Sequence, residues 1–91
     1  MTLSGIDGSN YIMSSIARLR YETGIIEGAK IIKTKDNYNV QFTGERAVWN
    51  GSNLVLSSAD KPYEARVFKS VDDAISATKE IGLKDEVINI T

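Results

Sequence analysis

The sequence predicts a single α+β domain: an antiparallel meander sheet with an N-terminal helix and a C-terminal helix packed on one face, and a short final strand. Two observations predict this fold. A capped helical pattern begins after Ser70, and from residue 25 onward short β-type runs are separated by turn residues. Ninety-one residues suffice for one modest core, so the whole chain, 1–91, is expected to form one domain.

The predicted C-terminal helix has the clearest local pattern. The Ser70 hydroxyl can accept a hydrogen bond from a free N–H of the first turn, and Asp72 and Asp73 lie where the helix dipole is positive. Gly82 suits the left-handed position that ends a helix. Apolar residues recur between these signals at helical spacing, namely Val71, Ala74, Ile75 and Ile81. We therefore interpret Ser70 and the two aspartates as capping residues rather than catalytic ones.

An N-terminal helix is predicted from Ser9 or Asn10 to Thr23, with Gly24 as its stop. Residues 1–6 before it are expected to be a flexible arm. The apolar positions of this helix follow at i, i+4 and i+7, and they are Ile12, Ile16 and Leu19. This spacing predicts an amphipathic helix laid across the sheet.

The strands are predicted from alternation and from turn residues. Tyr38, Val40 and Phe42 alternate with polar residues, which is typical of a half-buried antiparallel strand. Asn50-Gly51 tolerates the positive φ of a two-residue hairpin turn and should pair Trp49 with Ser52. The other predicted strands cover residues 29–35, 46–49, 54–56, 63–68 and 87–90. The sequence leaves open whether the last strand runs parallel to the strand at 63–68 or pairs elsewhere.

The absence of cysteine and histidine excludes several classes of function. The chain has no cysteine, which excludes disulfides, thiolate catalysis and cysteine-based metal sites. It has no histidine, the side chain most often used as a general base near neutral pH and the commonest metal ligand. No acidic residues follow the alternate spacing of an oxygen-ligand metal loop. We therefore expect no catalytic residue, no cofactor and no metal site.

Net charge and hydropathy limit the partners and the cellular location that we expect for the protein. The net charge is −1 at pH 7, whereas a dedicated nucleic-acid binder usually has a clearly basic balance. No apolar run approaches membrane-spanning length, and the N-terminal residues lack the basic and apolar blocks of a secretory signal. A cytoplasmic location without membrane contact is expected.

The preferred function is a non-catalytic interaction module, a small adaptor or inhibitor that binds a protein through the polar sheet face and the exposed hairpins. Its candidate contacts are Tyr38, Arg46, Trp49 and Asn50.

The alternative function is nucleic-acid binding through a basic helix and strand patch made of Arg18, Arg20, Lys30, Lys33 and Lys35. Strand lysines also protect sheet edges from aggregation, which is a structural explanation of Lys30, Lys33 and Lys35. Open sheet edges make a homodimer a further hypothesis. In size and texture the chain resembles small accessory proteins of plasmids, phages and other mobile elements, and no site residue is transferred from them.

Overall fold

The computed structural model describes residues 10–49, 51–58 and 64–90. The predicted arm at 1–6, Asn50 and most of the predicted loop before residue 63 lie outside the described residues. The described elements, in chain order, are β1 (Tyr11–Ile12), α1 (Ser14–Glu22), β2 (Gly28–Lys33), β3 (Tyr38–Thr43), β4 (Val48–Trp49), β5 (Ser52–Asn53), β6 (Val55–Leu56), α2 (Val71–Ile81), the 3-10 helix η1 (Asp85–Val87) and β7 (Ile88–Ile90). These helices and strands bear out the α+β class.

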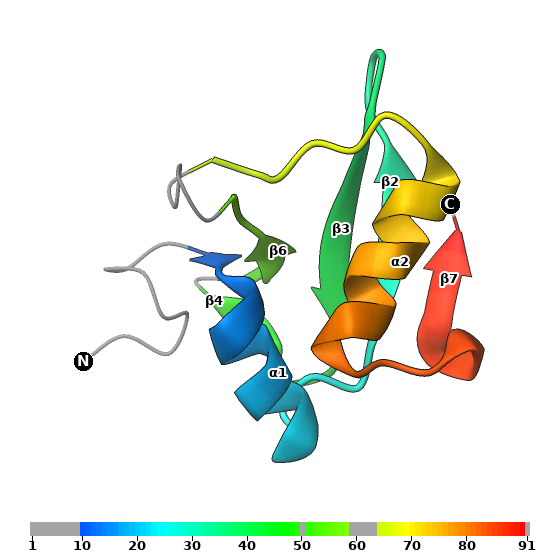
Figure 1. The fold of residues 1–91 in the computed structure, drawn as a ribbon. Coiled ribbons are helices and arrows are strands. Elements are labelled where there is room, and N and C mark those ends of the chain that lie inside the picture. Colours follow the sequence, from blue (N-terminus) through cyan, green and yellow to red (C-terminus); the bar gives the residue numbers. More distant parts are fainter. Residues whose placement is uncertain (1–9, 50, 59–63, 91) are drawn as a thin grey trace.

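The main sheet is mixed rather than purely antiparallel. It has five strands in the order β1-β6-β3-β2-β7, and β4 and β5 form a separate two-stranded sheet (Figure 1). The three middle strands are antiparallel neighbours, as a meander requires. Both outer pairs, β1 with β6 and β2 with β7, are parallel. The prediction of an antiparallel meander is therefore right at the centre of the sheet and wrong at both edges.

The N-terminal helix begins later than predicted because the residues before it form an edge strand. Tyr11 and Ile12 pair with β6, and Ile12 is fully buried in the core. The Ile12 carbonyl accepts a hydrogen bond from the Ser57 N–H at 2.8 Å, so this segment satisfies its backbone across the sheet instead of within a helix. The helix that follows buries Ala17, whereas Leu19, predicted on the apolar face, is 61% exposed.

The predicted hairpin at Asn50-Gly51 has the expected register. Trp49 is the partner of Ser52, and Gly51 has a φ of +81°. Arg46 lies in the turn before β4 rather than in the strand. The prediction that 54–56 completes this hairpin is wrong, because β6 leaves it and pairs with β1 and β3. The hairpin is thus an excursion between two strands of the main sheet.

The predicted strand at 63–68 is absent over its described part, 64–68. This segment makes only isolated bridges, from Ala65 to Ser57 and from Phe68 to Tyr38. Phe68 is buried, whereas its neighbours Arg66 and Val67 are both exposed, so burial along this segment does not follow the alternation of a strand. The final strand, β7, consequently pairs with β2 instead of with this segment.

Helix α2 agrees closely with its prediction. The Asp73 N–H donates to the Ser70 Oγ at 3.1 Å, and Gly82 ends the helix with a φ of +118°. The buried hydroxyl of Thr78 is satisfied inside the helix, where it donates to the Ile75 carbonyl at 2.7 Å. Local signals alone therefore fix both ends of α2.

Both helices lie on one side of the main sheet, as the sequence predicts. Figure 1 shows α2 lying across β2 and β3, with α1 beside it and in contact with it. The core fills the space between these helices and the sheet, and its largest fully buried side chains include Phe42, Ile12, Ile26, Ile31, Leu54 and Leu56. The helix side of the molecule is where α1, α2 and the 64–69 segment come together.

Candidate binding groove

A groove runs along one side of α2, between this helix and the elements that face it. It consists of two adjoining clefts of about 250 Å³ and 360 Å³, which share Arg66, Ala77 and Glu80. Its other lining residues come from α1, from the 64–69 segment and from α2, and they are Ser14, Ser15, Arg18, Val67, Phe68, Lys69, Asp73, Ser76 and Ile81. We call this feature the α2 groove.

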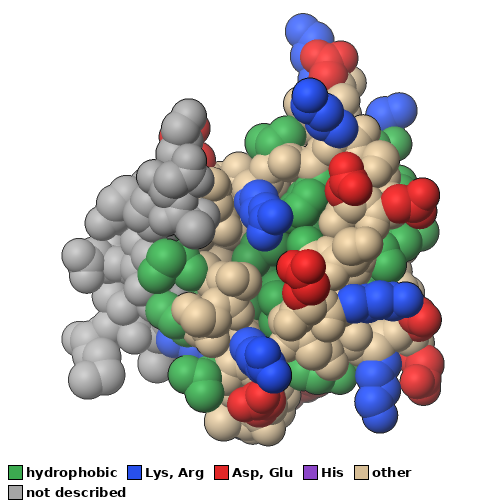
Figure 2. Space-filling model, in the orientation of Figure 1, with side chains coloured by type: hydrophobic (Ala, Val, Ile, Leu, Met, Phe, Trp, Pro, Cys, Tyr) green, Lys and Arg blue, Asp and Glu red, His purple; other side chains and the backbone are tan. Residues whose placement is uncertain are grey.

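The floor of the α2 groove is apolar. Ala77 and Ile81 are one helical turn apart, so they lie on the same face of α2, and they are 5% and 3% exposed. Figure 2 shows hydrophobic surface in a hollow on the helix side of the molecule, with basic side chains on one side and an acidic side chain on the other. Ala77 and Ile81 both belong to the hydrophobic core and present only a small part of their surface to the groove.

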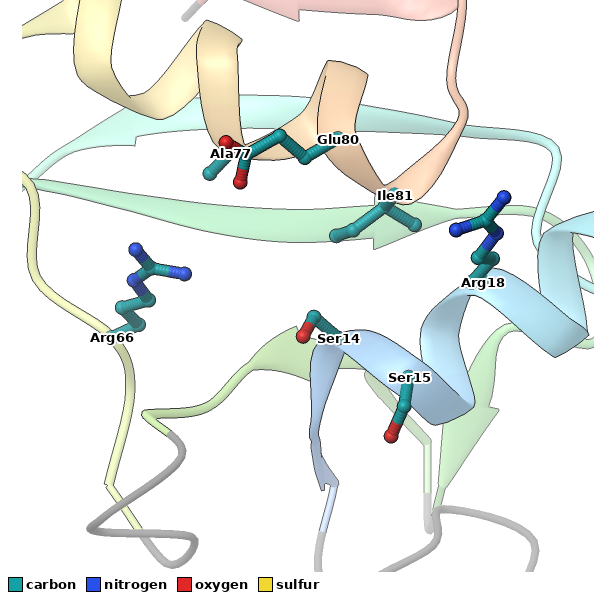
Figure 3. Close-up of a pocket in the computed structure, with 7 residues that line it drawn as sticks. All are labelled: Ser14, Ser15, Arg18, Arg66, Ala77, Glu80 and Ile81. Atoms are coloured by element: carbon teal, nitrogen blue, oxygen red, sulfur yellow. The ribbon is translucent and has the colours of Figure 1, made fainter.

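The first wall of the α2 groove is basic. The Arg66 guanidinium lies 4.8 Å from the centroid of the Phe68 ring, a cation–π contact that orients an otherwise exposed side chain. Arg18 reaches the other end of the groove, where its Nε is 3.4 Å from Glu22 Oε2. Figure 3 shows the two arginines at opposite ends of the cleft, with Ser14 between them.

The second wall of the α2 groove is acidic and belongs to α2. Glu80 is directed from this helix toward the Arg66 side of the cleft (Figure 3), and Asp73 lines the adjoining cleft. Within the described residues these carboxylates form no ion pair with Arg66 or Lys69, so both walls keep charge available for a ligand. The groove thus presents an apolar floor between walls of opposite charge.

The first cleft of the α2 groove contains three side chains that can act as nucleophiles, the hydroxyls of Ser14 and Ser15 and the carboxylate of Glu80. The sequence supplies no histidine to activate the hydroxyls. Among the described residues, no three acidic side chains lie close enough together to hold a metal ion. The groove can bury an apolar side chain of a ligand and can pair with the ligand's charged groups.

The structure separates the residues predicted to bind a protein. Tyr38 begins β3 and is half-buried against the core, where its backbone pairs with Phe68. Arg46 is exposed, and with Trp49 it belongs to the excursion that follows the far end of β3. Asn50 and the side chain of Trp49 lie outside what the structure describes. Of the described candidates, Tyr38 and Arg46 therefore lie at opposite ends of β3.

The five basic residues predicted for nucleic-acid binding are also dispersed. Arg18 and Arg20 are on α1, whereas Lys30 and Lys33 are on β2 and Lys35 is in the turn after it. Figure 1 shows this turn at the opposite end of the molecule from α1. The structure does not bring the five side chains onto one surface.

Arg20 and the lysines of β2 have surroundings that the sequence did not predict. Desolvation by burial lowers the pKa of the Arg20 guanidinium, which remains charged at neutral pH because its ordinary value is so high. β7 pairs with β2 over residues 29–31, so Lys30 is not on an open edge and edge protection does not explain it. Lys33 lies beyond this pairing, and edge protection stays a prediction for it.

Sequence reasoning missed the α2 groove because its walls come from three separate segments. Arg66 was assigned to a regular strand, and Glu80 was one exposed position of a predicted helix. The one local signal was the spacing of Arg66 and Phe68, two residues apart in an extended segment, which allows the guanidinium to stack on the ring.

Comparisons with protein-family models, with curated proteins and with solved structures found no match to this chain. In the described parts of the chain, neither helix combines the length and apolar character needed to span a bilayer. The function must therefore be argued from the surface itself.

Proposed function

We propose that this protein is a non-catalytic, protein-binding module that receives a peptide segment of its partner in the α2 groove. The observation that supports the proposal is the apolar floor of Ala77 and Ile81 between walls of opposite charge. An apolar centre surrounded by complementary charges is the usual composition of a specific protein contact.

The charges of the groove define the chemistry of the segment that would fit. Three basic side chains, Arg18, Arg66 and Lys69, line it against two acidic ones, Asp73 and Glu80. The first turn of α1 contains no acidic residue, so the end of the groove beside Ser14 stays electropositive. A segment with an apolar side chain on the floor and a carboxylate toward Arg18 and Arg66 satisfies both features.

The shape of the groove supports a peptide rather than a compact small molecule. Its two clefts lie end to end along α2 and are open to solvent, and a small ligand normally needs an enclosed pocket that buries most of its surface. Nucleic acid is a poorer candidate, because Asp73 and Glu80 would repel phosphates and the basic residues elsewhere are dispersed.

Selection from a random peptide library displayed on phage tests the proposal. We expect selected peptides to share an acidic residue near an apolar one and to lose at least about tenfold in affinity for the Arg66→Glu variant, as removal of a paired interfacial charge predicts. Lys35→Glu makes the same charge change outside the groove and should leave affinity unchanged. A peptide with its acidic residue replaced by lysine should regain affinity for Arg66→Glu.

Two results would contradict the proposal. One is peptides that bind Arg66→Glu and the wild-type protein equally well. The other is retention on a nucleic-acid column that falls steeply as salt rises, together with no peptide enriched above background, which would support the alternative function.

A further inference from the structure

β7 is a short strand, of three residues, at one edge of the main sheet. Among the described strands it pairs only with β2, and its residues, Ile88, Asn89 and Ile90, include no charge and no proline. Natural edge strands commonly carry one of these to prevent pairing with another chain. The Ile90 side chain is 60% exposed, which makes it one of the most exposed large apolar residues described.

The side chains of β7 extend the apolar side of the sheet to this open edge. Ile88 and Ile90 are the parallel partners of Ala29 and Ile31, which are fully buried beneath the helices. Partners in adjacent strands point to the same face, so both isoleucines lie on the helix side. Ile88 packs against the core, and Ile90, two residues later on the same face, is exposed to solvent.

Helix α2 contributes a neighbouring apolar residue to the same surface. Lys79 Nζ lies 2.9 Å from Asp85 Oδ1, so this side of α2 faces η1, directly before β7. Ile75 is one turn earlier on the same helix face and is half-buried against the core. Ile75 and Ile88 both pack against the core on this side of the sheet, and Ile90 is exposed on the same face, so we call these three residues the apolar strip.

The outer backbone edge of β7 is self-complementary. Along a strand, the N–H and C=O groups of successive residues point alternately to the two sides. The Ile88 N–H donates to the Asp85 carbonyl and not to β2, so the groups of Ile88 and Ile90 are on the outer side and those of Asn89 face β2. The Ile90 N–H and the Ile88 carbonyl remain there as one donor and one acceptor, two residues apart.

We propose that a second copy of this chain pairs antiparallel with β7 across a twofold axis. With Asn89 opposite Asn89 of the second copy, each Ile90 N–H donates to the other Ile88 carbonyl, and Ile88 of one copy meets Ile90 of the other. In such a contact both copies use the same surface, so assembly stops at a dimer and does not continue into a filament. The two sheets become one, and the apolar strips of both copies cover each other.

Charge on α2 agrees with the same axis. α2 runs antiparallel to β7 (Figure 1), so the twofold brings the Lys79 end of one helix toward the Asp72 end of the other. Lys79 already pairs with Asp85, so this arrangement avoids like-charge contact between the helices rather than adding an ion pair, whereas a parallel arrangement would place like charges together. The α2 groove is on the other side of α2, lined by Asp73 and Glu80, and stays open in the dimer.

Sedimentation equilibrium of the full chain over a wide range of concentrations tests this dimer. The mass should rise from 10.0 kDa toward twice that value as concentration increases. Ile90→Lys should weaken dimerisation by at least about tenfold, the effect of losing one buried isoleucine from each half of a contact. Leu19→Lys removes an equally exposed aliphatic side chain, 61% against 60%, from α1 and should leave dimerisation unchanged.

Amide exchange gives an independent readout, because the Ile90 N–H should become protected as concentration rises while amides around the α2 groove do not. A mass of 10.0 kDa at millimolar concentration would overturn the proposal. Equal dimerisation of the wild-type protein and Ile90→Lys, or loss of the dimer in Leu19→Lys, would also overturn it.

Discussion

Gly28 is at a point where β2 and the start of β7 approach too closely for any side chain. A Cβ on Gly28 would lie 2.5 Å from the Val87 carbonyl oxygen and 3.0 Å from Thr43 Oγ1, whereas ordinary contact begins near 3.4 Å. The Val87 oxygen belongs to the backbone and cannot rotate away. Gly28→Ala must therefore move η1 and β7 away from β2.

The cost of this substitution follows from overpacking. Forcing a methyl group into a filled site costs about 1–3 kcal/mol, and alanine recovers about 0.4–1 kcal/mol by restricting the unfolded chain. We expect a net loss of about 1–2 kcal/mol in the free energy of unfolding, measured by urea denaturation, with a fall in Tm of about 4–8 °C per kcal/mol. Amide exchange should locate the weakening at Asn89.

Gly82 provides a matched control, because its backbone conformation, and not a lack of space, favours glycine. Its φ is +118° and a Cβ there would meet only the Tyr21 ring, at 3.9 Å, so Gly82→Ala suffers backbone strain without a collision. Asparagine tolerates such a φ and should be milder than alanine at 82, whereas at 28 the larger side chain should be worse. Unchanged stability and unchanged exchange at Asn89 in Gly28→Ala would refute the steric argument.

Three further substitutions test the local interactions. Ser70→Ala should cost about 1 kcal/mol in urea denaturation because the Asp73 N–H loses its cap, whereas Ser76→Ala, at an exposed mid-helix position, should not destabilise; equal stability of the two variants would contradict the capping role. Phe42→Ala should cost about 3–5 kcal/mol because the ring is fully buried, and a loss below 1 kcal/mol would show that the site collapses around the cavity. Glu22→Gln should change stability by at most about 0.5 kcal/mol, since its ion pair with Arg18 is exposed, and a larger loss in thermal unfolding would reveal a contact beyond this pair.

Predictions from the sequence succeeded where the information is local. The cap at Ser70, the stop at Gly82 and the register of Trp49 with Ser52 depend on residues within a few positions of each other, and all three are confirmed. Hydroxyl-to-backbone capping and positive φ are properties of single residues, so no knowledge of the rest of the chain is needed.

The parallel edges of the sheet could not be predicted in this way. Ile12 has a helical apolar spacing with Ile16 and Leu19, and only the distant β6 determines that Tyr11 and Ile12 form a strand. The segment at 64–68 shows the opposite error, because its alternation resembles a strand although it finds only isolated partners. Tertiary pairing overrides local propensity for such short elements.

The α2 groove was unpredictable for the same physical reason. Arg18, Arg66 and Glu80 acquire a common site only when α1, the 64–69 segment and α2 are packed together. Tyr38 and Arg46 are near turns and were predictable as candidate contacts, because exposure at a hairpin can be inferred locally and convergence of distant segments cannot.

The parallel pairs at both edges also imply an order of events in folding. Tyr11 pairs with Val55, and Ala29 pairs with Ile88, and in each pair the second residue lies much later in the chain. Neither edge can therefore form until most of the chain is available. The β2–β3 hairpin and α2 depend on close neighbours and can form first, because closing a short loop costs less entropy than closing a long one. During synthesis on the ribosome, β1 therefore cannot take its place in the sheet until β6 has emerged, and the outer edge of β2 stays open until β7 has emerged.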